Sequence, residues 1–204
     1  MPTDTPAMFI ADAPGLDFLN SIATPASEPV DWIGDGCGLV DWLRQAGLVP
    51  EQQLAAIAAN AMPGELDRVA DQARDLREWF RGFVKGRMGR SLDAGALSKL
   101  APLNRLLERD EAYGQVVLRH DHLALETARR WRSPEALLIP IGEALARVVV
   151  EEDFAQVKAC QGSACTLLFA DHTRGRARRW CSMGVCGNRA KVAAHRSRQR
   201  SRAS

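Results

Sequence analysis

Four cysteines near the end of the chain constrain the fold more than any other feature. Cys160, Cys165, Cys181 and Cys186 form two C-x4-C pairs separated by fifteen residues, while Cys37 stands alone. An odd number of cysteines and an N-terminus without the basic and apolar segments of a secretory signal argue against a disulfide framework. Two pairs of thiolates suit Zn²⁺, which binds four sulfurs in a tetrahedron at about 2.3 Å. We therefore predict one structural zinc ion and a cytoplasmic protein.

The residues between the paired cysteines support this interpretation. Residues 161–164 and 182–185 are small or flexible, as tight turns require. Two alternatives stay open, namely four incidental buried thiols and a site in which His172 or His195 replaces a cysteine. A redox C-x-x-C pair is absent from the sequence.

Charge is distributed unevenly along the chain. Residues 155–204 contain eleven Lys and Arg and one acidic residue, Asp171, whereas residues 1–154 contain sixteen basic and twenty-four acidic residues. The formal net charge of +2 conceals this difference. A strongly basic end predicts a polyanionic partner. The alternative is a solvated tail that only keeps the protein soluble.

Three short motifs around the cysteines resemble a known family. They are FADHTR at residues 169–174, RRWCSM at 178–183 and CGNRAK at 186–191, and they resemble the CGNR zinc finger. The resemblance covers about residues 155–200, with Thr173 where the family usually has serine. Upstream, LDFLNS at 16–21 and LVDWLRQAGL at 39–48 resemble the opening motifs of the ABATE domain, which accompanies this finger. The resemblance implies a stress-induced transcription regulator.

The hydrophobic pattern predicts a mainly α (α+β) protein. We expect a helical ABATE-like domain with a small β-hairpin over residues 1–153, and a treble-cysteine-loop zinc finger ending in a basic helix over 154–204. Period-3.6 patterns and Pro/Gly breaks predict an extended piece running into a helical turn over 8–22, a loop over 25–38, and helices over 39–46, 51–61 and 65–87. Asp93 is a candidate cap for a helix with Leu97, Leu100 and Leu103 on one face. Residues 115–119 and 122–127 read as the hairpin, and Ser133-Pro134 as the start of the last helix of this domain.

The basic end predicts contacts with DNA. We expect a helix over 189–200 that begins at a Gly187-Asn188 cap and presents cations to a DNA groove, because guanidinium groups bind phosphates and guanine edges. The expected nucleic-acid-binding residues are Arg174, Arg176, Arg178, Arg179, Arg189, Lys191, His195, Arg196, Arg198 and Arg200. In an alternative reading, the finger binds protein or RNA, and Arg178, Arg179 and Trp180 serve the zinc fold.

The remaining expectations concern partners and catalysis. No phosphate loop, nucleophile elbow or Ser/His/Asp set is recognisable, so the sequence predicts a regulator rather than an enzyme. A small-molecule effector could bind the N-terminal domain, in a pocket lined by Trp42 and Trp79, although tryptophans more often fill a core. We expect DNA as the partner, no membrane span, and a homodimer as one possible assembly. His120 and His122 are spaced for one strand face, where a solvated pair is favoured over a metal site.

Overall fold

The computed structural model describes residues 6–24, 28–193 and 199. Its α-helices are α1 (Pro14–Leu19), α2 (Gly36–Ala46), α3 (Glu51–Asn60), α4 (Glu65–Lys85), α5 (Ala101–Leu107) and α6 (Leu138–Glu151). Its strands form three separate antiparallel pairs, β1 (Ile22–Ala23) with β2 (Val30–Asp31), β3 (Ala112–Arg119) with β4 (His122–Arg129), and β5 (Val157–Ala159) with β6 (Leu168–Ala170). The mainly helical α+β class is confirmed.

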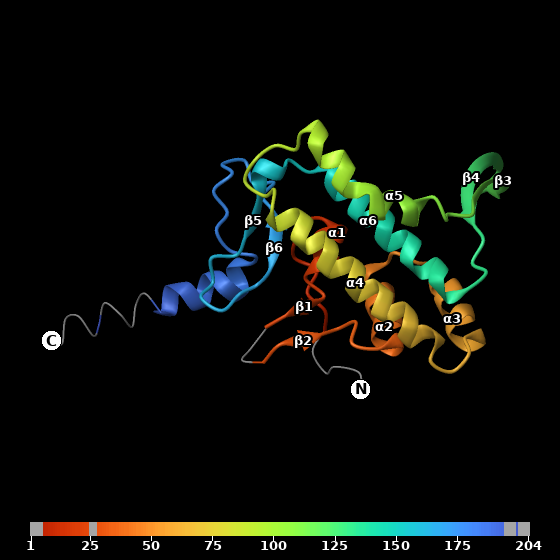
Figure 1. The fold of residues 1–204 in the computed structure, drawn as a ribbon, viewed down its shortest axis with the longest axis horizontal. Coiled ribbons are helices and arrows are strands. Elements are labelled where there is room, and N and C mark those ends of the chain that lie inside the picture. The colour runs from red at the N-terminus through yellow and green to blue at the C-terminus, as the bar shows by residue number, and fades with distance from the viewer. Residues whose placement is uncertain (1–5, 25–27, 194–198, 200–204) are drawn as a thin grey trace.

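The short helix α1 lies at the centre of the molecule. It packs against α4, α6 and β6 (Figure 1). Gly15 makes the close approach to α6 possible, because a Cβ at this position would lie 2.5 Å from the carbonyl oxygen of Ala144. Leu16, Phe18 and Leu19 of α1 are fully buried. The hydrophobic core therefore forms around a helix of six residues.

A buried ion pair fixes the β1–β2 region to α4. Arg77 donates to both carboxylate oxygens of Asp31, at 2.7 and 2.6 Å, and to the hydroxyl of Ser21 at 2.9 Å. Burial alone would raise the pKa of Asp31, but these hydrogen bonds from Arg77 lower it below its usual value. The ion pair therefore supplies hydrogen-bond acceptors to the guanidinium of Arg77, which has almost no contact with solvent.

Most predicted elements lie within a few residues of the observed ones. The helices expected at 51–61 and 65–87 are α3 and α4, and the hairpin is β3–β4, longer at its base than predicted. Two boundaries differ. The helix expected from residue 39 begins at Gly36, because the Asp35 side chain accepts a hydrogen bond from the N–H of Gly38 and caps it. The loop expected over residues 25–38 also contains β2.

The helix expected after Asp93 is also different. Residues Ala94–Leu100 form a 3-10 helix, and α5 follows it after a change of helical type at Pro102. The side chain of Asp93 makes no capping hydrogen bond. Leu100 and Leu103 are buried as predicted, but Leu97 is exposed, because the tighter 3-10 turn rotates it away from the core. Ser133 likewise precedes a short 3-10 helix, Pro134–Leu137, that continues into α6.

The core continues across the predicted division between residues 153 and 154. Phe154 is buried against Phe83 of α4, with ring centroids 6.0 Å apart, and its carbonyl accepts a hydrogen bond from Gly89. The amide of Asn20 donates to the Leu168 carbonyl at 2.8 Å, and the Leu168 N–H donates back to the Asn20 oxygen at 2.9 Å. The division into two domains stays a prediction from sequence, and the two parts share one hydrophobic core.

None of the helices in the described residues is long and apolar enough to span a membrane.

Candidate zinc centre and basic surface

The four predicted zinc ligands come together at one end of the molecule. Cys160 follows β5, Cys165 lies in the turn before β6, Cys181 follows a loop after β6, and Cys186 lies in the π-helical turn Met183–Gly187. All four Sγ atoms lie within 4.8 Å of one another. The Cys165–Cys181 and Cys181–Cys186 Sγ distances are 3.8 and 3.6 Å. A tetrahedron with Zn–S bonds of about 2.3 Å has sulfurs about 3.8 Å apart.

The chemistry of the cluster fits a divalent cation. The Cys165 sulfur is hydrogen-bonded to the Cys181 thiol, which lowers the pKa of Cys165 to about 5 and raises that of Cys181 far above its usual value. Burial raises the pKa of Cys186 to about 11. Four such sulfurs lose all their protons only when a cation compensates their charge. The cluster therefore binds one structural zinc ion, and the alternative of incidental thiols is wrong.

Backbone N–H groups stabilise the sulfur of Cys160. Gly162 and Cys181 donate to it from 3.4 and 3.3 Å. A side chain at position 162 would crowd the cluster, because its Cβ would lie 3.1 Å from the Cys186 sulfur. The His172 ring is instead hydrogen-bonded to Glu152 at 2.6 Å. His195, the other alternative ligand, lies outside the described residues.

The helix after the cluster begins earlier than predicted. The hydroxyl of Ser182 accepts a hydrogen bond from the Gly184 N–H, so Ser182 is the cap rather than Gly187-Asn188. The π-helical turn continues directly into helical residues 188–193. Cys186 therefore lies inside this helical segment, which explains how the metal site and the basic segment are joined.

Asp171 organises the loop between β6 and Cys181. Its carboxylate is 0% exposed and accepts hydrogen bonds from the Lys158 ammonium, the Thr173 hydroxyl and N–H, and the Arg178 N–H. Although burial acts in the opposite direction, these donors hold the pKa of Asp171 well below its usual range. Asp171 is the only acidic residue after position 154, so its burial leaves the finger without an exposed carboxylate.

Arg178 has a structural role that corrects its predicted role in DNA binding. Its guanidinium donates to the carbonyls of Ile10 at 2.8 Å and Trp180 at 3.0 Å, and also to that of Cys181. It forms an ion pair with Asp12 and lies over the Phe169 ring, 4.3 Å from the centroid. These contacts join the cysteine loops to the N-terminal segment and occupy the groups that a phosphate would need.

The other predicted DNA contacts within the described residues are exposed. This set contains Arg174, Arg176, Arg179, Arg189 and Lys191. Arg176 donates to the carbonyl of Asp171, and Arg179 donates to the Gln161 side chain at 2.7 Å while its guanidinium lies over Trp180. His195, Arg196, Arg198 and Arg200 lie outside the described residues.

Fold and site together define a small helical protein that carries a four-cysteine zinc finger. Comparison with family models agrees with this. Residues 12–152 match the ABATE family, described as "Putative stress-induced transcription regulator", and residues 156–199 match the CGNR zinc finger. The chain belongs to the ABATE family and ends in a CGNR zinc finger. Neither family is described as an enzyme family. No curated protein matches the chain.

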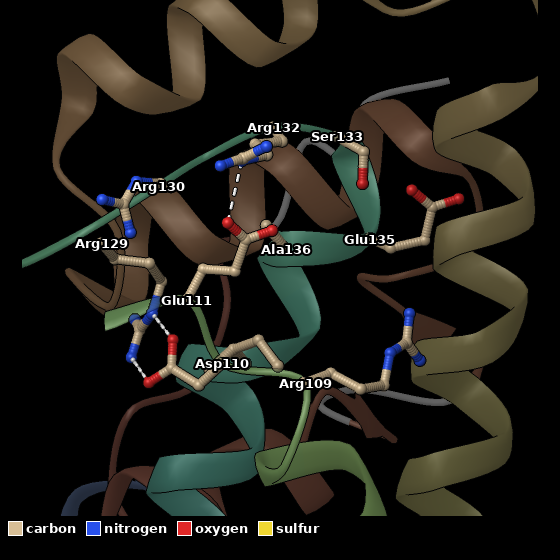
Figure 2. Close-up of a pocket in the computed structure, with 10 residues that line it drawn as sticks. Arg109, Asp110, Glu111, Arg129, Arg130, Arg132, Ser133, Glu135 and Ala136 are labelled. Carbon is tan, nitrogen blue, oxygen red and sulfur yellow. Dashed lines mark hydrogen bonds and ion pairs between the residues drawn. The ribbon is translucent and has the colours of Figure 1, made fainter. Parts of the chain in front are cut away.

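Trp42 fills the core, the role that the sequence favoured over a pocket lined by Trp42 and Trp79. Trp42 is 1% exposed and lies against Phe18 and Phe9, with ring centroids 5.6 and 5.8 Å apart. A polar pocket is found elsewhere, at the base of the hairpin (Figure 2). Two of its four arginines are paired with its carboxylates, Arg129 with Asp110 and Arg132 with Glu111. His120 and His122 are exposed near the hairpin tip, where His120 adopts a positive φ of 56°.

Two residues position the finger, of which sequence reasoning missed Asn20 and assigned Arg178 a role in the zinc fold only in the alternative reading. Asn20 and Arg178 both hold it against the N-terminal domain, through partners 148 and 168 positions away in the sequence. Asn20 lies in the LDFLNS motif and Arg178 opens the RRWCSM motif. Both positions lie in motifs of the resemblance, but a motif does not indicate which distant residue each side chain contacts.

Proposed function

We propose that the protein is a DNA-binding transcription regulator in which the zinc centre orients a cationic surface. The supporting observation is that the one acidic side chain of residues 155–204 is buried, while Arg174, Arg176, Arg179, Arg189 and Lys191 are exposed. Within residues 155–204 the described surface therefore has exposed cations and no exposed acidic side chain, which suits the phosphates of a nucleic-acid backbone; the neighbouring carboxylate of Asp12 is paired with Arg178. Helical residues 188–193 and the chain beyond them supply the base contacts in this proposal.

The proposed location and effector follow from the same function. The cysteine thiols stay available for zinc in a reducing compartment, which supports a cytoplasmic protein. The N-terminal domain would carry the regulatory input, and the polar pocket at the hairpin base is the proposed effector site.

Salt dependence of binding tests the DNA proposal. If about six phosphates are contacted, the logarithm of the binding constant falls with log[salt] with a slope of roughly −5. Fluorescence anisotropy with a labelled duplex would measure this slope for the zinc-loaded full chain. Replacing Arg174 and Lys191 with alanine should reduce the slope by about one unit each. The matched control is Lys99→Ala, an exposed cation away from the finger. Binding that is indifferent to salt overturns the proposal.

The second candidate is a zinc module that binds RNA or protein. The structural role of Arg178 favours it in part, because in that reading Arg178, Arg179 and Trp180 serve the zinc fold. A single-stranded RNA of the same length in the same assay discriminates between the two. Preference for the duplex supports the DNA regulator, and preference for the single strand supports the alternative.

A further inference from the structure

The two faces of the β3–β4 hairpin differ in character. The register pairs Val116 with Leu125 and Leu118 with Leu123, so these four side chains share one face. The other residues on this face are Ala112, Gly114 and Thr127, and at the base Arg129, which forms ion pairs with Asp110 and Glu143. The charged side chains of the strands above the base point to the opposite face, where Arg119 and Glu126 form an ion pair. We call the group of Val116, Leu118, Leu123 and Leu125 the hairpin apolar face.

The hairpin apolar face is open to solvent. Its four side chains are 65–78% exposed. The sheet contains only these two strands, so the outer edge of each strand forms no backbone pairing with another strand of the described residues. The hairpin projects from the end of the molecule opposite the zinc finger (Figure 1). Isolated two-stranded hairpins are marginally stable in water, and an exposed apolar cluster of this kind marks an interaction site.

The base of the hairpin holds it in a fixed direction. Arg129 donates to the two carboxylate oxygens of Asp110, at 2.6 and 2.9 Å, and to Glu143 of α6 at 2.7 Å. Arg132 pairs with Glu111 at 2.8 Å, and Figure 2 shows both pairs at the root of the strands. These contacts anchor the strands to α6, so the apolar face is presented in one orientation rather than left to fold back onto the core.

The charge pattern indicates what covers this face. DNA or an anionic membrane would need available cations on it, and the one cation among its strand residues, Arg129 at the base, is paired with Asp110 and Glu143. A second copy of the same face can pack against the first without repulsion between like charges. A two-fold interface needs a surface that fits itself, and a face of uniform apolar character does so. Four side chains with roughly 100 Å² of apolar area each give roughly 800 Å² over two copies. That area is below the roughly 1,200 Å² of a standard interface and suits a weak dimer.

We propose that the hairpin apolar face is the homodimer interface of this protein, with two hairpins packed face to face. From the sequence a homodimer was one possible assembly, and no interface was visible. Because the hairpin and the finger lie at opposite ends, pairing leaves both fingers free (Figure 1). A dimer then offers two cationic surfaces to one nucleic acid, which raises the effective concentration of the second finger once the first has bound. The dimer itself does not depend on what the finger binds.

Analytical ultracentrifugation of the zinc-loaded full chain tests this proposal without any nucleic acid. The wild type should show concentration-dependent dimerisation in the micromolar range. Replacing Leu118 and Leu125 together with lysine should weaken association at least about 100-fold, because four like charges would be buried in the interface. The control carries the same two lysines on the opposite face, at the exposed positions Gln115 and His122, and should dimerise like the wild type. Circular dichroism and zinc content verify that each variant is folded.

Two results overturn the proposal. The first is a wild type that stays monomeric at every concentration measured. This includes the case in which the monomer binds neutral phosphatidylcholine vesicles instead. The other is equal dimerisation of the Leu118/Leu125 variant and the control. DNA affinity is measured separately, so a failure of the DNA proposal leaves the result on dimerisation intact.

Discussion

Asp17 is a buried carboxyl whose titration should be visible in the stability of the protein. Its Oδ1 accepts hydrogen bonds from the N–H groups of Ile10 and Ala11, at 2.8 and 2.9 Å. Burial outweighs these bonds and raises its pKa to about 6. A carboxyl whose pKa is higher in the folded state than in the unfolded chain binds protons on folding. Its protonation therefore adds stability at low pH, and this contribution is lost as the pH rises through 6.

We predict that Asp17→Asn removes this dependence. The amide keeps an oxygen acceptor for both N–H groups without the charge, so the variant should be more stable than the wild type by about 2 kcal/mol at pH 8. At pH 5 Asp17 is mostly protonated in the folded wild type, so the difference in unfolding free energy should be smaller there by about 1 kcal/mol. Urea unfolding of both proteins between pH 5 and pH 8 measures this difference in unfolding free energy. Because the zinc ligands titrate in both proteins, their contribution cancels in the difference. Asp75→Asn, at an exposed position, is the control. A constant difference across the range contradicts the prediction.

Arg178 should matter for zinc retention through its geometry rather than its charge. Lysine at this position keeps the charge but loses the planar fork that reaches the carbonyls of Ile10, Trp180 and Cys181. We expect Arg178→Lys to destabilise the finger by about 2 kcal/mol. Release of zinc to a chromogenic chelator should be faster by at least about tenfold. Arg174→Lys, in the same loop and exposed, should release zinc at the wild-type rate. Equal rates for the two variants would remove the structural role assigned to Arg178.

At the scale of elements, the cysteine loops should depend on zinc while the helices around α1 should not. Cys186 lies within the helical segment that carries Arg189 and Lys191, so losing this ligand should release the segment from β5 and β6. We predict that Cys186→Ser lowers zinc content below one equivalent. Amide hydrogen exchange should then accelerate over residues 160–193 and stay slow in α4. Cys37→Ser, which changes the cysteine outside the cluster, should keep zinc and protection. If the amides of residues 188–193 stay fully protected from hydrogen exchange in the Cys186 variant, the segment does not depend on zinc and the prediction is wrong.

The elements that could be predicted from sequence are those specified by neighbouring residues. The zinc ligands were predicted because two local turns, each with small residues between its cysteines, define the site. The helix α4 was predicted because its buried positions recur every three or four residues. The hairpin was predicted from alternation, but alternation does not tell whether the apolar face meets the core or solvent, and here it meets solvent. The contacts of Arg178 with Ile10 and Asp12 could not be predicted, because these partners belong to a segment far away in the sequence.

At the scale of the whole molecule, the finger is built on the N-terminal domain rather than attached to it by a linker. β6 is buried at all three positions and contacts α1, with its Ala170 N–H bonded to the carbonyl of Ala11. Phe154 and Val157 are also buried, and together with β6 they belong to the same hydrophobic core as the buried residues of the N-terminal part. In a fragment of residues 154–204 these side chains and the backbone of Leu168 would be exposed to water.

We therefore predict that the fragment of residues 154–204 binds zinc through its cysteines but does not form the β5–β6 pair. Its amide resonances should lack the dispersion of a folded strand pair, and its zinc affinity should fall by at least about tenfold, because binding must also order the chain. Adding the separately expressed residues 1–153 should restore affinity if both pieces assemble through α1 and β6. In the full chain, Asn20→Ala removes both hydrogen bonds to Leu168 and should lower the midpoints of zinc release and of unfolding together, by an amount corresponding to about 2 kcal/mol. An isolated fragment with native dispersion and wild-type zinc affinity would instead establish two independent folding units, since its strands would then need no support from α1.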